Sequence, residues 1–215
     1  LMGFRDDSVK GLMPVPRDSI LRAAAARLLL LLGALALFLP GFFSLPPTDR
    51  DESRFAQASR QMLEDGDYLH IRFQEQARLN KPAGIYWLQA AAARLAGTGW
   101  DNPIWPFRLP SLLGALAAVV LTARLGDRLG RPGTGWRAGA LLALTVLLGA
   151  EARLAKTDAV LLALVVAAQA ALWAIYRAHR AHRPVPMAAV QGFWLAQAAA
   201  LLVGGATAGS RAPKT

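Results

Sequence analysis

The chain has 215 residues, of which 54% are hydrophobic and only 18% are charged, below the roughly 25% typical of soluble domains. The absence of cysteine excludes a disulfide framework and a cysteine-ligated metal site. The net charge of +10 would suit a nucleic-acid binder, but the basic residues flank apolar segments, so we expect no nucleic-acid partner.

Five apolar segments approach the roughly 20 residues that a membrane-spanning helix needs. They cover residues 20–43, 104–125, 136–155, 158–176 and 187–208, between a basic tail at 1–19 and a short tail at 209–215. The first segment lacks a small-x-small cleavage site, which favours a retained span over a signal peptide. The composition, rich in Ala and Leu, therefore predicts an all-α integral membrane protein with about five transmembrane helices.

The basic residues predict the orientation of these spans. They gather before the first span, between the second and third, and after the fourth: Arg5, Lys10, Arg17, Arg22 and Arg27; Arg124, Arg128, Arg131 and Arg137; Arg177, Arg180 and Arg183. The positive-inside rule places these regions in the cytoplasm. We therefore expect a multi-pass protein of the cell (inner) membrane, with residues 44–103 forming a loop that faces outward.

This outer loop is predicted to hold two amphipathic helices at the membrane surface. Thr48 or Asp49 can cap a helix over residues 51–65, whose apolar side chains recur at helical spacing until Gly66 stops it. Residues 68–72 alternate and are expected to be extended. A second helix is predicted over residues 83–95, where Tyr86 and Trp87 suit a membrane interface.

Charged residues of the two outer loops are the candidate site, although each has a simpler explanation. Asp51 and Glu52 stand at a predicted helix start, where the helix dipole favours acids. Arg54 and Lys81 could contact lipid headgroups. Asp158 could be the N-terminal charge of the fourth span.

The joint pattern is more specific than its parts. Across about residues 28–174 it resembles the membrane glycosyltransferases related to protein O-mannosyltransferases and to the bacterial aminoarabinose-lipid A transferase. The resemblance rests on four segments in order: Asp51-Glu52-Ser53-Arg54-Phe55-Ala56; Met62-Leu63-Glu64-Asp65-Gly66-Asp67-Tyr68; Leu79-Asn80-Lys81-Pro82-Ala83-Gly84-Ile85-Tyr86-Trp87-Leu88; and Ala152-Arg153-Leu154-Ala155-Lys156-Thr157-Asp158.

The resemblance implies a C-type glycosyltransferase fold and transfer of a sugar from a polyprenyl-phosphate donor to a lipid, glycan or protein acceptor. It implies that Asp51 is the first-loop catalytic acid, with Glu52 beside it, and that Asp158 is the second outer-loop acid. Arg54 and Lys81 match positions expected near the donor phosphate. Cations suit a departing phosphate and a carboxylate suits an incoming nucleophile.

Two departures qualify the resemblance. Aminoarabinose transferases usually carry Glu where this chain has Asn80, which disfavours both a metal ligand at that position and aminoarabinose as the substrate. A divalent cation elsewhere is left open. Family members have about a dozen spans, so we expect the chain to be the amino-terminal part of such an enzyme.

The alternative is a non-catalytic membrane protein, such as a piece of a transporter or an inactive fragment. A transporter should place polar groups near the middle of the membrane, whereas the acids here gather in the outer loop. The acceptor and the sugar are left open by the sequence.

Overall fold

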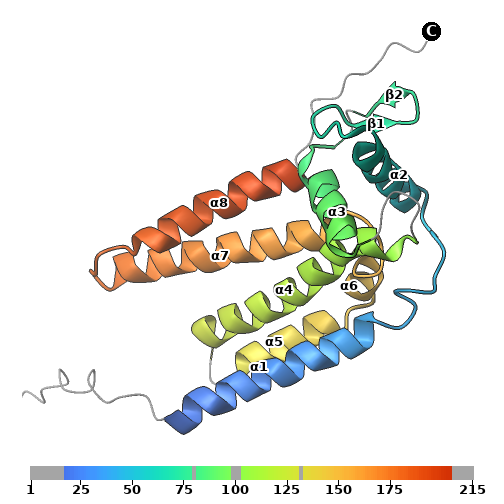
Figure 1. Cartoon of the computed structure of the whole chain (residues 1–215). Coiled ribbons are helices and arrows are strands. Elements are labelled where there is room, and N and C mark those ends of the chain that lie inside the picture. The colour runs from blue at the N-terminus through green and yellow to red at the C-terminus, as the bar shows by residue number, and fades with distance from the viewer. Residues whose placement is uncertain (1–16, 79–80, 98–102, 131–132, 205–215) are drawn as a thin grey trace, which may run out of the picture.

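The long helices lie side by side, and a small helical cap covers one end of them (Figure 1). The computed structural model describes residues 17–78, 81–97, 103–130 and 133–204; most of both predicted tails and Asn80 lie outside these ranges. The elements are α1 (Arg17–Phe38), α2 (Arg50–Asp65), β1 (Arg72–Phe73), β2 (Gln76–Ala77), α3 (Gly84–Leu95), α4 (Trp105–Leu129), α5 (Thr134–Ala143), α6 (Val146–Glu151), α7 (Asp158–Arg180) and α8 (Met187–Gly204). The all-α membrane fold is confirmed.

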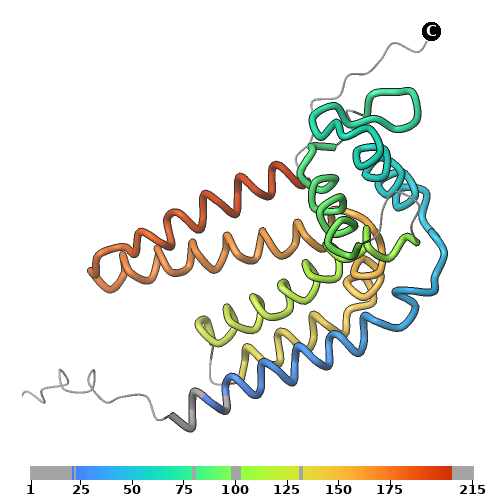
Figure 2. The backbone as a smooth tube through the Cα atoms, viewed as in Figure 1, coloured from blue at the N-terminus to red at the C-terminus, as the bar shows by residue number. Residues whose placement is uncertain are grey.

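The two ends of the bundle differ. At the end we call the hairpin end, α2, α3 and the antiparallel β1–β2 hairpin cover the start of α4 and of α7 (Figure 1). At the opposite end, α4 and α7 finish and the chain turns into α8. Figure 2 shows the chain leaving α1 and running along the edge of the molecule to α2.

Among the described residues, three helices are long and apolar enough to cross a membrane: α4, α7 and α8. Helix α1 contributes a shorter apolar stretch, Ala23–Phe38, and ends before Pro40, which cannot continue a helix. Residues 136–155, predicted as one span, instead form α5 and α6 with a break between them. The spanning state of the first and third predicted segments stays a prediction.

The break between α5 and α6 has a local cause. Thr145 is extended, with φ −67° and ψ 129°, and its hydroxyl donates to the carbonyl oxygen of Leu142 at 2.7 Å. Side-chain bonds of this kind compete with the helical hydrogen bonds of the backbone. The mean hydropathy of the segment does not reveal this competition, because one threonine changes the average of an otherwise apolar run very little.

Glycines let the long helices approach closely. A Cβ added at Gly114 of α4 would lie 2.8 Å from the Cα of Val160 in α7, and one added at Gly139 of α5 would lie 3.1 Å from the carbonyl oxygen of Val119 in α4. Small residues at such crossings bring backbones into contact, which is how helices associate where water supplies no hydrophobic drive. The α4–α5 and α4–α7 contacts are among the most extensive in the chain.

Helices α2 and α3 match the two predicted outer-loop helices to within one residue. Asp49 caps α2 by accepting from the Asp51 amide, and Gly66 ends it with φ 66°. The two helices pack against one another and share a buried hydrogen bond of 2.7 Å from the Ser59 hydroxyl to the Gln89 side chain.

The structure corrects one expectation for α3. Tyr86, predicted to suit a membrane interface, is fully buried against Phe55, and its hydroxyl accepts from Arg78 at 2.7 Å. Burial raises the pKa of this phenol, although the bond from Arg78 acts in the opposite direction. The neighbouring Trp87 is 41% exposed. Of the two aromatic side chains, only Trp87 is placed to meet an interface.

Candidate functional site

A buried ion pair organises the hairpin end. Glu52, in the first turn of α2, is fully buried and accepts from Nε of Arg108 in α4 at 2.7 Å. Its carboxylate also accepts from the backbone amides of Ala155 at 3.2 Å and Thr48 at 3.3 Å. Both carboxylate oxygens of Glu52 are therefore engaged by the protein itself.

Arg108 distributes its remaining donors over the chain that leaves α1. Its guanidinium donates to the carbonyl oxygens of Phe42 at 2.8 Å, Leu45 at 3.0 Å and Pro46 at 3.3 Å. Those carbonyls follow a helix end, where the backbone lacks helical partners. The Glu52–Arg108 pair therefore fixes the path from α1 to α2 and the position of the α2 N-terminus.

The segment between α6 and α7 is held at the same place. Arg153 donates to the carbonyl oxygen of Pro40 at 2.8 Å, and the Ser111 hydroxyl of α4 donates to that of Lys156 at 3.0 Å. Together with the bond from Ala155 to Glu52, these contacts hold Lys156 and the start of α7 beside α2.

Lys156 and Asp49 join the two outer segments by a salt bridge. The hydrogen bond from Lys156, with that from the Asp51 amide, lowers the pKa of Asp49. Burial alone would lower the pKa of Lys156, but its bond to Asp49 and the nearby charges of Glu151 and Asp158 raise it instead. Both partners therefore stay charged across the neutral range.

The predicted acids Asp51 and Asp158 each lie two residues beyond a member of this salt bridge. Asp51 is exposed at the start of α2, 3.7 Å from the guanidinium of Arg54. Asp158 begins α7, lies within the electrostatic range of Lys156, and lines a pocket with Glu151. The pocket measures about 420 Å³, and its other walls are mainly apolar: Leu142, Leu147, Leu148, Ala159 and Leu162.

Lys81 makes no side-chain contact with Asp51, Arg54 or Asp158 among the described residues. It is half-buried just before α3. Helix α3 begins against the end of α8, since a Cβ on Gly84 would lie 2.5 Å from the Leu202 carbonyl oxygen. Lys81 is therefore on the hairpin end, but the structure does not show it touching the other candidates.

Within the described ranges, no group of three or more His, Asp or Glu side chains gathers in a way that could hold a metal ion. The charged groups described at the hairpin end are carboxylates and cations. Together they can accept a proton, and they can hold an anion.

Sequence reasoning missed Arg108, Lys156 and Glu151 as members of this site. Arg108 offered one signal, because an arginine inside the apolar run 104–125 needs a partner in the membrane. Lys156 lay within one of the four segments that carry the resemblance, but the sequence assigned it no role. Glu151 carried no signal beyond its place beside the short turn before the fourth span.

Comparison with known proteins identifies the fold. The chain is similar to the ArnT enzyme from Cupriavidus metallidurans in the apo state, with a TM-score of 0.66 and 23% identity over 86% of this chain. It is also similar to the structure of that enzyme bound to undecaprenyl phosphate, with a TM-score of 0.60 and 22% identity over 89% of this chain. In both cases the chain spans only 33% of the solved protein. These likenesses confirm the expected C-type glycosyltransferase fold.

A family model supplies the classification. No curated protein matches the chain. The model described as dolichyl-phosphate-mannose-protein mannosyltransferase matches residues 80–205, which include Lys81, Arg108, Glu151 and Asp158 but not Asp51 to Arg54. Because this match covers more than half of the sequence, the chain belongs to the dolichyl-phosphate-mannose-protein mannosyltransferase family.

Proposed function

We propose that this chain carries part of the active site of a membrane glycosyltransferase. The enzyme would move a sugar from a polyprenyl-phosphate donor to a lipid, glycan or protein acceptor on the outer face of the cell membrane. One observation carries the proposal: Asp51, Arg54, Asp158 and Lys156 gather at one end of a membrane helix bundle. The buried Glu52–Arg108 pair holds in place the chain segments that carry these residues.

The proposed reaction is a displacement at the anomeric carbon of the donor sugar. A hydroxyl of the acceptor forms the new bond to that carbon, while the bond from the carbon to the phosphate oxygen breaks. The departing phosphate keeps the electron pair, and a carboxylate takes the hydroxyl proton. Asp51 is assigned as that carboxylate because it is exposed and not enclosed by protein groups.

The remaining residues take supporting roles in this proposal. Arg54 and Lys81 hold the donor phosphate, since guanidinium and ammonium groups form strong charge-assisted bonds to phosphate oxygens. Asp158 acts as the second acid, facing the pocket beside Glu151. Glu52 positions the others and does not react, because its carboxylate is buried and fully bonded.

Two further findings support the donor class. The leucine-lined pocket beside Asp158 offers apolar walls that suit a polyprenyl chain. A protein of similar fold has been solved with undecaprenyl phosphate bound.

The test is a comparison of two carboxylate substitutions on one helix. In the enzyme that contains this chain, Asp51→Asn should lower sugar transfer at least about 100-fold, the usual scale for loss of a general base. Asp65→Asn, at the exposed far end of α2, is the matched control and should leave transfer unchanged. Transfer is followed as release of free lipid phosphate from donor extracted from the source cells. Equal transfer by both variants, at equal protein abundance, would contradict the proposal.

A further inference from the structure

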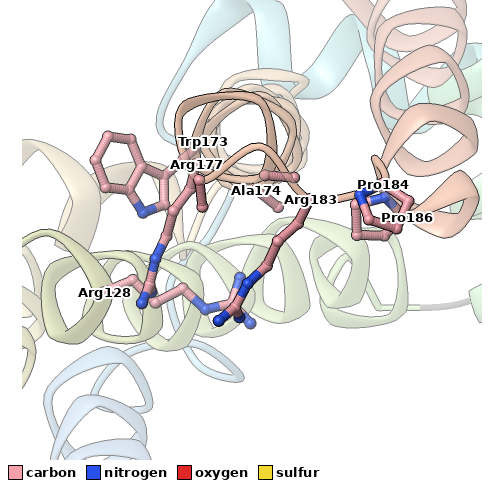
Figure 3. A pocket seen from close by; sticks show the side chains of 9 residues that line it. Arg128, Trp173, Ala174, Arg177, Arg183, Pro184 and Pro186 are labelled. Carbon is pink, nitrogen blue, oxygen red and sulfur yellow. The ribbon is translucent and has the colours of Figure 1, made fainter. Parts of the chain in front are cut away.

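Three arginines converge at the end of the bundle opposite the candidate site. Arg128 comes from the last turn of α4, Arg177 from the last turn of α7, and Arg183 from the turn between α7 and α8. Together with Trp173, Pro184 and Pro186 they line a pocket of about 330 Å³. Figure 3 shows the three side chains directed into the same space beside the α7–α8 turn.

No carboxylate accompanies these cations. None of the three forms an ion pair with an acidic side chain in the described part of the chain, and none of the residues that line the pocket is acidic. The indole nitrogen of Trp173 is also buried without an acceptor among the described residues. Among the described residues, the pocket therefore gathers hydrogen-bond donors and positive charge with no acidic side chain to pair with them.

General rules account for arginines here but not for their convergence. Cations are favoured near helix C-termini, and basic residues flank spans on the cytoplasmic side. Both rules are satisfied by arginines that point separately into water, as Arg180 and Arg124 are free to do on the exposed surface. Arg128, Arg177 and Arg183 are exposed, so water screens their mutual repulsion in part, and an anion held between them would offset it further.

An apolar groove continues from this pocket along the bundle. It measures about 370 Å³, lies between α4 and α7, and is lined by Leu125, Leu129, Gln169, Leu172, Trp173 and Tyr176. Trp173 belongs to both surfaces. A ligand that fills both must therefore carry an anionic head and an apolar chain.

The depth of the pocket agrees with such a ligand. Helix α7 has 23 residues, which at about 1.5 Å per residue spans roughly 35 Å. The hydrocarbon core of a bilayer is about 30 Å thick. With α7 across the membrane, its last turn and the arginines beside it lie at the level of the lipid phosphates.

We propose that this site, formed by Arg128, Arg177, Arg183 and Trp173, binds the phosphate of an anionic phospholipid, with an acyl chain of the lipid in the α4–α7 groove. The site lies a helix length away from the candidate active site and takes a different lipid. It fixes the ends of α4 and α7 to the α7–α8 turn, so the bound lipid stabilises the bundle.

The experiment uses the purified chain in neutral detergent, with phosphatidylglycerol brominated in its acyl chains as the probe. Bromine quenches tryptophan fluorescence at contact, so a brominated lipid chain in the groove lowers the fluorescence of Trp173. Brominated phosphatidylglycerol should quench at lower concentration than brominated phosphatidylcholine. Trp173→Phe should remove this difference, although five other tryptophans are present.

Substitution of the arginines tests the headgroup. Each of Arg128→Gln, Arg177→Gln and Arg183→Gln should weaken phosphatidylglycerol binding roughly fivefold, the scale of one juxtamembrane cation. Arg180→Gln is the matched control, since Arg180 ends the same helix but does not line the pocket. Equal weakening by Arg180→Gln would show diffuse attraction instead of a site and would overturn the proposal.

Two further outcomes separate the sources of the anion. The proposal requires that inorganic phosphate fail to displace the brominated lipid at concentrations where unlabelled phosphatidylglycerol displaces it. Full displacement by phosphate would show that the arginines bind a free anion and would overturn the proposed lipid site.

The melting temperature of each variant, measured without lipid, controls for unfolding: a variant that melts normally yet loses the lipid supports the site. Unchanged lipid binding by the Arg128→Gln/Arg177→Gln/Arg183→Gln triple variant contradicts it.

Discussion

At the scale of single residues, Glu52 and Arg108 form a buried charged pair that fixes the segments around the candidate site. The pair is almost completely buried, at 0% and 1% side-chain exposure. Taking two such charges out of water is costly, and the cost is offset only when every oxygen and donor finds a partner. Here the partners are backbone groups from two segments, the connection from α1 to α2 and the connection from α6 to α7.

We therefore predict that Arg108→Met destabilises the protein by about 3–5 kcal/mol, because Glu52 is left as an unpaired buried charge. Glu52→Gln should also lower the melting temperature, whereas Glu64→Gln on the exposed surface of α2 should not. The measurement is thermal unfolding in detergent, alongside transfer activity. A Glu52→Gln variant that melts like the native protein yet loses transfer would restore Glu52 to a catalytic role.

Lys81 gives a second prediction at this scale. Lys81→Ala should weaken use of the polyprenyl-phosphate donor about tenfold or more, the value of one lost charge-assisted contact. Lys81→Arg keeps a cation and should retain most of the donor affinity. The apparent donor affinity is read from transfer at varied donor concentration. No change in Lys81→Ala would remove this residue from the donor site.

At the scale of helices, glycine spacing sets how closely α4 and α7 can pack. Gly114→Ala places a methyl group 2.8 Å from the backbone of Val160, which must move. We predict a loss of about 1–3 kcal/mol from this overpacking. Gly33→Ala in α1 is the control: among the described residues no atom of another helix lies within 4 Å of the added carbon, and alanine gains up to about 1 kcal/mol in a helix. An equal fall of the unfolding midpoint in Gly114→Ala and Gly33→Ala would contradict the close packing of α4 against α7.

Local signals explain which elements the sequence predicts well. Helix α2 begins and ends within one residue of expectation because a capping Asp49, a stopping Gly66 and the apolar spacing between them are all short-range features. Helix α3 has no side-chain cap, and its bounds also agree with expectation to within one residue. The break at Thr145 escaped prediction because hydropathy does not register a hydroxyl that competes for one carbonyl. A burial like that of Tyr86 depends on Arg78 and Phe55, which no periodicity brings together.

The candidate site was predictable only in part for the same reason. Asp51, Arg54 and Asp158 were found by their motifs, and the structure brings their segments together. Arg108 is 56 residues from Glu52 in sequence, and Ala155 is 103 residues away. Contacts at such separation follow from the tertiary fold, so the sequence indicated that Arg108 needs a partner but not that this partner is Glu52.

At the scale of the whole molecule, orientation in the membrane is the main untested prediction. The chain has no cysteine, so single cysteines report cleanly on exposure. Glu64→Cys at the hairpin end should react with an impermeant thiol reagent on intact cells. Arg180→Cys at the opposite end should react only after permeabilisation. Both positions are exposed in the structure. The reverse pattern would invert the topology and move the proposed site to the cytoplasm.

The long reach of the Glu52 contacts also sets an order of events during biosynthesis. A ribosome adds about 5–20 residues per second, so roughly 3–11 seconds separate the synthesis of Glu52 from that of Arg108, its partner 56 residues later. Ala155 follows later still. Until α4 has been made, the Glu52 carboxylate must stay hydrated, and α2 cannot settle into its final place. A nascent chain stalled before residue 108 therefore offers the unfinished loop after α1 to proteases and chaperones.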